Sequence, residues 1–239
     1  MERPLDYFDV DSRFGLKLVS LFRYFQEAAV MHSERVGIGS RTLVNDGTVW
    51  ILNKIAAEII RYPEYGETVT VTTWSRGAKG FKAFRDFVVS SGDQRLAVAA
   101  SIWLYFDMKR KRIVRVPGDL IEAYSVEDET VLDLDLDAWR PEAEFEPEAH
   151  IEITTRSSDF DPLGHVNNSL YFDYLETMAS RAFAANGRIG ELKIQFQKEI
   201  GARCRAVRAG GLNADDGCRF KIFSDDKVHA AGSMTFLGG

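Results

Sequence analysis

The sequence is poor in the residues that build metal sites and disulfide frameworks. It has two cysteines, Cys204 and Cys218, among 239 residues. Two are too few for a disulfide framework or a four-cysteine zinc site, and we expect ordinary thiols. The four histidines show no metal-ligand spacing; they are His32, His150, His165 and His229. Neither a metal nor another cofactor is therefore expected.

Long hydrophobic runs are also missing. The longest apolar run without charge covers residues 96–106, whereas a membrane-spanning helix needs about 20 residues. The first residues, Met1 to Asp6, lack the basic and apolar regions of a secretory signal. We therefore expect no membrane span and a cytoplasmic location. With 45% hydrophobic and 12% aromatic residues, the chain can bury a core, as one large domain or two small ones.

Several catalytic motifs are absent as well. The sequence has no G-x-S-x-G elbow, no G-x-x-x-x-G-K-[ST] phosphate loop and no G-x-G-x-x-G dinucleotide turn. These absences argue against a serine hydrolase of that type, a P-loop nucleotidase and a dinucleotide-dependent enzyme.

Charge is distributed unevenly along the chain. Residues 118–150 contain twelve acidic residues and one basic residue, whereas the rest of the chain has 29 basic and 24 acidic residues. The densest basic cluster comprises Lys109, Arg110, Lys111, Arg112 and Arg115. It is either a solvated turn or a surface for an acidic protein partner. A nucleic-acid partner is not expected, because the chain lacks an overall basic footprint with interleaved aromatic residues.

An internal repeat organises the chain. At an offset of 150 residues, Asp9-Val10-Asp11 aligns with Asp159-Phe160-Asp161, and Phe22-Arg23-Tyr24-Phe25 aligns with Phe172-Asp173-Tyr174-Leu175. Each copy continues into an amphipathic stretch with helical spacing and then into segments with the alternation of strands. The predicted strands cover residues 50–61, 67–75, 81–90 and 95–107, and then 190–198, 203–208, 219–224 and 228–237. A long helix wrapped by an antiparallel sheet, made twice, predicts an α+β fold.

We expect three parts along the chain. Residues 1–117 form the first copy, residues 118–150 an acidic connector, and residues 151–239 the second copy. The connector contains two prolines, Pro141 and Pro147, and Pro117 directly precedes it. Its charge and proline content favour an exposed crossing segment.

The two copies differ just before the helix. The first has Asp11-Ser12-Arg13-Phe14-Gly15-Leu16, and the second has Asp161-Pro162-Leu163-Gly164-His165-Val166, followed by Asn167 and Asn168. The second copy alone combines a carboxylate, an imidazole and two carboxamides near a helix start, which suits acyl chemistry. A purely structural turn would be expected in both copies, so this difference favours a chemical role.

These residues resemble a known signature. Asp161-x-x-Gly164-His165-Val166-Asn167-Asn168, with Tyr171 and Glu176, resembles the signature of hot-dog fold thioesterases. The wider chain is similar to the acyl-acyl carrier protein (acyl-ACP) thioesterases of plants and bacteria. Further matching segments are Tyr24 to Ala29, Arg61-Tyr62-Pro63, and Ser101-Ile102-Trp103. The resemblance covers roughly residues 5 to 237 and implies a tandem (double) hot-dog fold.

The resemblance implies an enzyme, a thioester hydrolase of fatty acid biosynthesis that releases free fatty acid from acyl-ACP. It assigns catalytic roles to Asp161, His165 and Glu199. Two positions depart from the family: Leu163 stands where an asparagine is usual, and Ile200 where plant members often have cysteine. The second departure argues against a cysteine nucleophile at that position.

A mechanism can be written without the family's asparagine and without a cysteine nucleophile. We expect Glu199 to activate water as the general base, because a partly apolar cleft raises the pKa of a carboxylate. Asp161 would orient it or act as the second carboxylate, and His165 would position or polarise the thioester. The backbone N–H groups from Gly164 to Val166 would stabilise the oxyanion. Asn167 and Asn168 are expected as loop and helix-cap ligands.

The resemblance makes the first copy the scaffold and the acyl pocket. Aromatic side chains are the candidates to line it: Trp50, Trp74, Phe81, Phe84, Phe87 and Trp103. Because carrier protein is acidic, basic residues are the candidates to dock it: Lys79, Lys82, Arg85, Lys109, Arg110, Lys111 and Arg112.

Three interpretations stay open. The first is an acyl-ACP thioesterase, the second an acyl-coenzyme A thioesterase of the same fold. The third is a non-catalytic module that binds acyl thioesters. A monomer and a homodimer are both compatible with the sequence, because a double hot-dog already contains the pairing that single-domain relatives make by dimerising.

Overall fold

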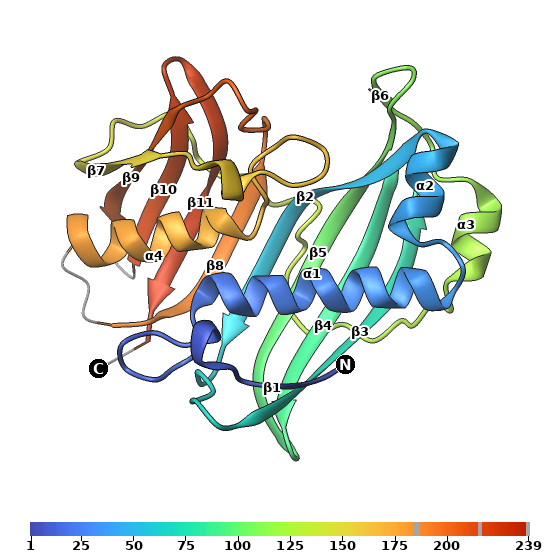
Figure 1. Ribbon diagram of the computed structural model, residues 1–239, viewed down its shortest axis with the longest axis horizontal. Coiled ribbons are helices and arrows are strands. Elements are labelled where there is room, and N and C mark those ends of the chain that lie inside the picture. The colour runs from blue at the N-terminus through green and yellow to red at the C-terminus, as the bar shows by residue number, and fades with distance from the viewer. Residues whose placement is uncertain (184–186, 215–216, 238–239) are drawn as a thin grey trace. The chain divides into compact units, whose positions relative to one another are not determined.

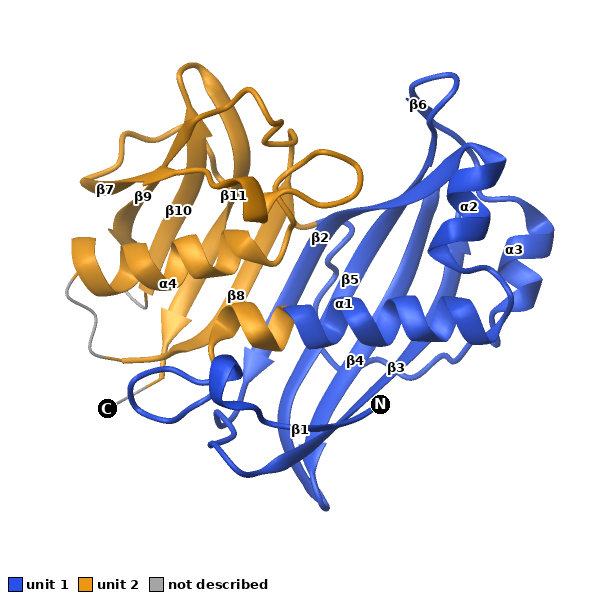
Figure 2. Cartoon of the chain, in the orientation of Figure 1, with its two compact units in different colours: residues 1–16, 23–138 blue, residues 17–22, 139–239 orange. Residues whose placement is uncertain are grey.

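The chain folds into two compact units. The computed structural model describes residues 1–183, 187–214 and 217–237. Unit 1 comprises residues 1–16 and 23–138, and unit 2 comprises residues 17–22 and 139–239 (Figure 2). The boundary at residue 138 falls inside the segment predicted as a connector. In the described residues, no helix is long and apolar enough to cross a membrane.

Unit 1 is an antiparallel sheet with three helices. Its sheet has the order β1-β3-β4-β5-β2, and β6 pairs with β5. The strands are β1 (Glu2–Pro4), β2 (Thr48–Ile59), β3 (Thr68–Lys79), β4 (Lys82–Ser91), β5 (Gln94–Asp107) and β6 (Arg112–Ile113). The helices are α1 (Leu18–Arg35), whose first residues belong to unit 2, α2 (Ser40–Asp46) and α3 (Gly118–Ala123).

Unit 2 repeats this plan with a shorter helix. Its antiparallel sheet has the order β8-β11-β10-β9-β7. The elements are β7 (Ala149–Thr154), α4 (Leu170–Ala182), β8 (Ile189–Phe196), β9 (Ala206–Ala214), β10 (Gly217–Ser224) and β11 (Lys227–Phe236). In each unit a helix lies across the sheet, α1 in one and α4 in the other (Figure 1).

The predicted helix and meander in each copy are confirmed. The four long strands of unit 1 match the prediction to within a few residues at either end, whereas β9 begins later than predicted, at Ala206. Five short helices and strands were not predicted: β1, α2, β6, α3 and β7. Short elements carry too few periods for a pattern to stand out.

The predicted apolar stripe of α1 is buried against the unit 1 sheet. Leu21, Phe25 and Ala28 are buried, and the ring of Phe25 lies 5.0 Å from that of Phe87 on β4. Each fully buried large apolar side chain contributes roughly 1.5–3 kcal/mol. Phe87 therefore marks the face of the sheet that α1 covers.

The opposite face of this sheet is covered by an irregular segment, residues 125–138, which we call the acidic strap. Successive strand residues point to opposite faces, so Asp86 points away from α1. The buried Asp86 Oδ2 accepts the N–H of Val131, 3.1 Å away, and the indole of Trp74 donates to Glu129 O at 3.1 Å. The first part of the predicted connector is thus packed against unit 1.

Two lysine side chains bind oxygen atoms of the acidic strap. The buried Lys54 ammonium donates to Leu136 O at 3.0 Å and to Asp137 O at 3.1 Å. Lys82 forms an ion pair with the carboxylate of Asp137. The strap therefore supplies hydrogen-bond and ion-pair partners to Lys54 and Lys82.

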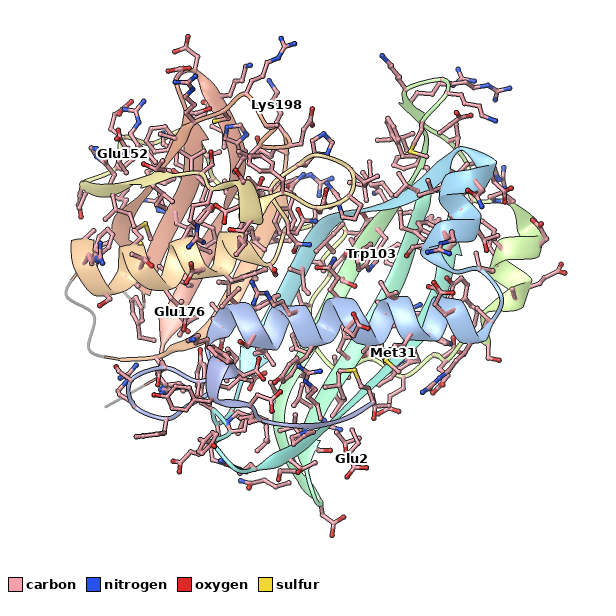
Figure 3. All side chains as sticks on the ribbon, in the orientation of Figure 1. Glu2, Met31, Trp103, Glu152, Glu176 and Lys198 are labelled. Carbon is pink, nitrogen blue, oxygen red and sulfur yellow. The ribbon has the colours of Figure 1, made fainter. Side chains whose placement is uncertain are left out.

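In unit 2, α4 packs with the first turn of α1. The rings of Phe22 and Phe172 stack at 3.4 Å between centroids, and Tyr171 meets Phe196 edge to face at 5.2 Å. Glu176, labelled on α4 in Figure 3, accepts the Leu18 N–H through Oε2 at 3.0 Å. A carboxylate at this helix start compensates the unpaired N–H groups and the positive end of the dipole.

A buried histidine joins the ends of β8 and β11. His229 is 2% exposed, and its Nε2 lies 2.7 Å from Ser224 Oγ. Its Nδ1 lies 3.2 Å from Lys198 O, so Nδ1 donates to that carbonyl and the neutral ring accepts from the hydroxyl. Its backbone carbonyl accepts the N–H of Gln197 at 2.8 Å. Burial lowers the pKa of His229, and the nearby Lys227 acts in the same direction.

We predict that Lys54→Met loosens the acidic strap. The variant keeps the volume but removes the charged donor to two carbonyl groups, which costs about 1–3 kcal/mol of unfolding free energy. Denaturant unfolding measures this loss, and hydrogen exchange of residues 125–138 should become faster. The exposed Lys79→Met on β3 is the matched control. Equal unfolding free energies for the two variants would contradict the role of Lys54.

We also predict that acid destabilises the protein through His229. Because the folded state holds the neutral ring, its contribution is full above the ordinary pKa of about 6.5 and is lost as pH falls toward the lowered pKa. His229→Gln should flatten the fall in unfolding free energy between pH 7.5 and pH 5 in part only, because burial also lowers the pKa of His32. The exposed His150→Gln is the control variant. If all three proteins lose stability equally, this assignment is wrong.

Candidate active site

The predicted catalytic loop is held together by one aspartate. The Oδ1 atom of Asp161 accepts the N–H of Leu163 at 2.9 Å and that of His165 at 3.3 Å. The Asp161 N–H donates to His165 O at 2.8 Å, which closes the turn. Gly164 has φ +80°, a left-handed conformation that other residues adopt at a cost of roughly 1–2 kcal/mol. The loop therefore requires its aspartate and favours its glycine.

The first copy contains the same turn. Asp11 Oδ1 accepts the N–H of Arg13 at 2.8 Å and that of Gly15 at 3.1 Å, and the Asp11 N–H donates to Gly15 O at 2.8 Å. Phe14, which corresponds to Gly164, has φ 59°. A structural turn is thus present in both copies. For Asp161, the sequence difference between copies is therefore not evidence of a chemical role, and what distinguishes the second copy is His165.

The loop is tied to the end of β8. The Val166 N–H donates to Ile200 O at 2.9 Å, and His165 forms an isolated β-bridge with Gly201. Glu199 thus lies two residues from the bridge partner of His165. His165 is half-buried and Glu199 is exposed. Among the described residues, no hydrogen bond or ion pair joins the side chains of Asp161, His165 and Glu199.

The segment before Glu199 is fixed by the histidine described above. The His229 ring binds the backbone carbonyl of Lys198, and the His229 carbonyl accepts the backbone N–H of Gln197. Lys198, labelled in Figure 3, directly precedes Glu199. Nothing in the sequence distinguishes His229 from the other scattered histidines, because its role arises from pairing between distant strands. Ile200 is fully buried, so the position at which a cysteine nucleophile was considered faces the core.

The expected oxyanion donors are occupied. The Gly164 N–H donates to Asp161 O at 2.9 Å, the His165 N–H donates to Asp161 Oδ1, and the Val166 N–H donates to Ile200 O. Asn167 Oδ1 accepts from the N–H and the hydroxyl of Ser169, at 2.9 and 2.8 Å, just before α4. Asn168 is half-buried, and no hydrogen bond of its side chain is found in the described part of the chain. The three N–H groups expected to stabilise an oxyanion, those of Gly164, His165 and Val166, therefore already have acceptors.

A second aspartate supports the same loop. Asp159 is 2% exposed, and its carboxylate accepts from the N–H of Arg156 at 2.8 Å and from the Nε of Arg156 at 3.0 Å. Its carbonyl accepts the Asn167 N–H at 2.9 Å. The sequence pointed to Asp159 only as part of the repeat, although it anchors both ends of the loop.

The aromatic residues predicted to line an acyl pocket are not brought to one place. Trp50 and Trp103 pair with residues on the α1 face, Trp50 lying 4.9 Å from Tyr105. Trp74 and Phe84 lie on the face of the acidic strap. Phe81 is 44% exposed. Because strand side chains alternate between faces, aromatic content alone could not sort them.

The residues predicted to dock the carrier also lie in different environments. Exposed positions around the turn between β5 and β6 are occupied by Lys109, Arg110, Lys111 and Arg112, and Lys79 is also exposed. Lys82 is paired with Asp137. Arg85 is only 7% exposed and points toward α1. Arg85 is therefore removed from the predicted docking surface.

Within residues 1–183, 187–214 and 217–237, no group of three or more His, Cys, Asp and Glu side chains could hold a metal ion. Cys204 and Cys218 are free, and Cys218 is buried.

Curated relatives of the chain are plant proteins about twice its length. Acyl-[acyl-carrier-protein] hydrolase FATB3, chloroplastic, from Cuphea viscosissima is 27% identical over 199 residues, which cover 75% of this chain and 46% of that protein. Dodecanoyl-[acyl-carrier-protein] hydrolase, chloroplastic, from Cinnamomum camphora is 27% identical over 213 residues, covering 80% and 53%. The chain spans about half the length of the curated relatives it matches.

Solved structures match the fold along the whole chain. An acyl-ACP thioesterase from Bacteroides thetaiotaomicron has a TM-score of 0.86 at 19% identity, covering 99% of this chain and 96% of that one. The 12:0-ACP thioesterase from Umbellularia californica has a TM-score of 0.84 at 18% identity, covering 99% and 96%. These neighbours confirm the predicted double hot-dog plan.

Family models account for both units. The acyl-ACP thioesterase N-terminal domain matches residues 1–124, and the acyl-ACP thioesterase C-terminal domain matches residues 142–236. Together with the loop geometry, these matches show that the chain belongs to the acyl-ACP thioesterase family.

Proposed function

We propose that the chain hydrolyses the thioester of acyl-ACP and releases a free fatty acid. The observation that carries the proposal is the tie between the two halves of the site: the loop bearing His165 is bonded to the segment that follows Glu199. Membership of the family supports the reaction class. A thioester is already activated, so hydrolysis needs a positioned water, a base and stabilisation of the oxyanion.

In the proposed mechanism Glu199 is the general base. Its carboxylate removes a proton from water as the oxygen attacks the thioester carbonyl. The bond to sulfur then breaks, and the thiolate of the carrier takes up a proton. His229 and Ser224 act as positioning residues, because they hold the backbone immediately before Glu199.

His165 and Asn168 are the proposed groups that face the developing oxyanion. The N–H groups of Gly164, His165 and Val166 donate elsewhere, so we assign this role to side-chain N–H groups; both residues are half-buried. Asp161 acts on His165 through the backbone, since its Oδ1 accepts the His165 N–H. Leu163, 44% exposed, contributes only its N–H to this turn.

We expect Glu199→Gln and His165→Gln to lower kcat/KM by about 10²–10⁴-fold, the range of general acid–base catalysis. Asp161→Asn keeps an oxygen acceptor for the turn and removes the charge. Its matched control is Asp11→Asn, which makes the same change in the first copy and should leave kcat/KM unchanged. Thiol release from matched acyl-ACP and acyl-coenzyme A substrates is the measurement.

The same assay separates the alternatives. Faster turnover of acyl-coenzyme A would favour a coenzyme A thioesterase. Tight binding of acyl thioester without thiol release by folded protein would favour a binding module. Full activity in Glu199→Gln would contradict the proposed base.

Carrier docking is proposed at the basic turn, Lys109, Arg110, Lys111 and Arg112. Reversing these four residues to glutamate should raise KM for acyl-ACP and leave turnover of a small acyl thioester intact, because charge steers the carrier but not the small substrate. Added salt should raise KM in the wild type and not in the variant. Reversal of the exposed Arg95 on β5 is the control. Equal losses on both substrates would refute docking at this turn.

A further inference from the structure

Arg85 on β4 is a cation buried among neutral groups. It is 7% exposed, and its Nη1 lies 2.8 Å from His32 Nδ1 and 3.2 Å from Thr73 Oγ1. Its guanidinium carbon lies 5.5 Å from the ring centre of Tyr124. These contacts come from α1, β3 and the segment after α3, and they surround Arg85 on the helix-covered side of the sheet.

Within the described part of the chain, no carboxylate pairs with Arg85. The neighbouring Asp86 points to the opposite face, where its carboxylate lies 3.7 Å from Arg76. His32 adds no negative charge, and burial together with Arg85 and Arg35 lowers its pKa. A buried charge without a counter-ion is costly to the folded protein. A bound ligand of opposite charge would offset this cost.

One edge of the guanidinium could bind such a ligand. Both hydrogen bonds of Arg85 leave from Nη1, and none is found from Nε or Nη2 to the described residues. The Nε–Nη2 edge is one that binds a carboxylate through two parallel N–H···O bonds. His32 and Ser33 are both half-buried near the end of α1, and Ser33 Oγ lies 2.7 Å from the Tyr124 hydroxyl.

We propose that unit 1 has a carboxylate-binding site formed by Arg85, with His32 and Tyr124 as its walls. The apolar surroundings of α1 and β4 suit a fatty carboxylate. Two sources share this chemistry: the free fatty acid, and an acyl chain with a second carboxylate at its far end. The choice of a fatty ligand rests on the proposed function, whereas binding at Arg85 does not require hydrolysis.

Calorimetric titration of the full chain with decanoate and with decanol tests the site. We expect decanoate to bind more tightly, and Arg85→Met to weaken decanoate at least tenfold while decanol binding is unchanged. Arg85→Lys keeps the charge but loses the paired N–H groups, so its effect should be smaller; it serves as the test if Arg85→Met does not fold. The exposed Arg95→Gln is the control.

Two further measurements distinguish the free fatty acid from an acyl chain with a second carboxylate. Inhibition of thiol release by decanoate that is lost in Arg85→Met identifies the free acid. A loss of kcat/KM confined to ω-carboxydecanoyl thioesters, with decanoyl thioesters unaffected, identifies the second carboxylate. Equal affinity of the wild type for decanoate and decanol, or unchanged decanoate binding in both Arg85 variants, would overturn the site. Binding without hydrolysis would sink the proposed function and leave the site standing.

Discussion

The carboxylate that caps each pre-helix turn is the constraint on which the rest of the site depends. Asp161 Oδ1 holds the backbone of Leu163 and His165, and Asp11 does the same in the first copy. This bond fixes the left-handed residue of the turn and hence the direction in which the next side chain leaves. It also occupies the His165 N–H, one of the donors expected to stabilise an oxyanion.

The same turn therefore occurs in both copies but presents different side chains. Where the second copy has Gly164 and His165, the first has Phe14 and Gly15, with Phe14 in a conformation that glycine adopts more easily. Phe14 lies 6.2 Å from Tyr65, and both rings are more than half exposed. The first copy has kept the turn without the imidazole. In unit 1 the acidic strap binds charged side chains on one sheet face, and among the described residues no carboxylate pairs with Arg85 on the other.

Much of this plan could be predicted from the sequence, because it follows from local patterns. The offset of 150 residues, the apolar stripe of α1 and the alternation of the long strands each repeat often enough to be recognised. The burial of Arg85, the strap and the role of His229 could not be predicted. On β4 both faces of the sheet are covered, so alternation does not separate inside from outside. His229 acts through residues brought near by strand pairing, for which a single sequence carries no signal.

In the mechanism that we propose, water activated by the carboxylate of Glu199, three residues after β8, attacks the thioester directly. Rapid-quench measurement of thiol and free fatty acid, with enzyme near the concentration of substrate, tests it most directly. Direct attack predicts that both products appear at the same rate from the first turnover. A burst of thiol that precedes the acid would reveal a covalent acyl-enzyme and contradict direct attack by water.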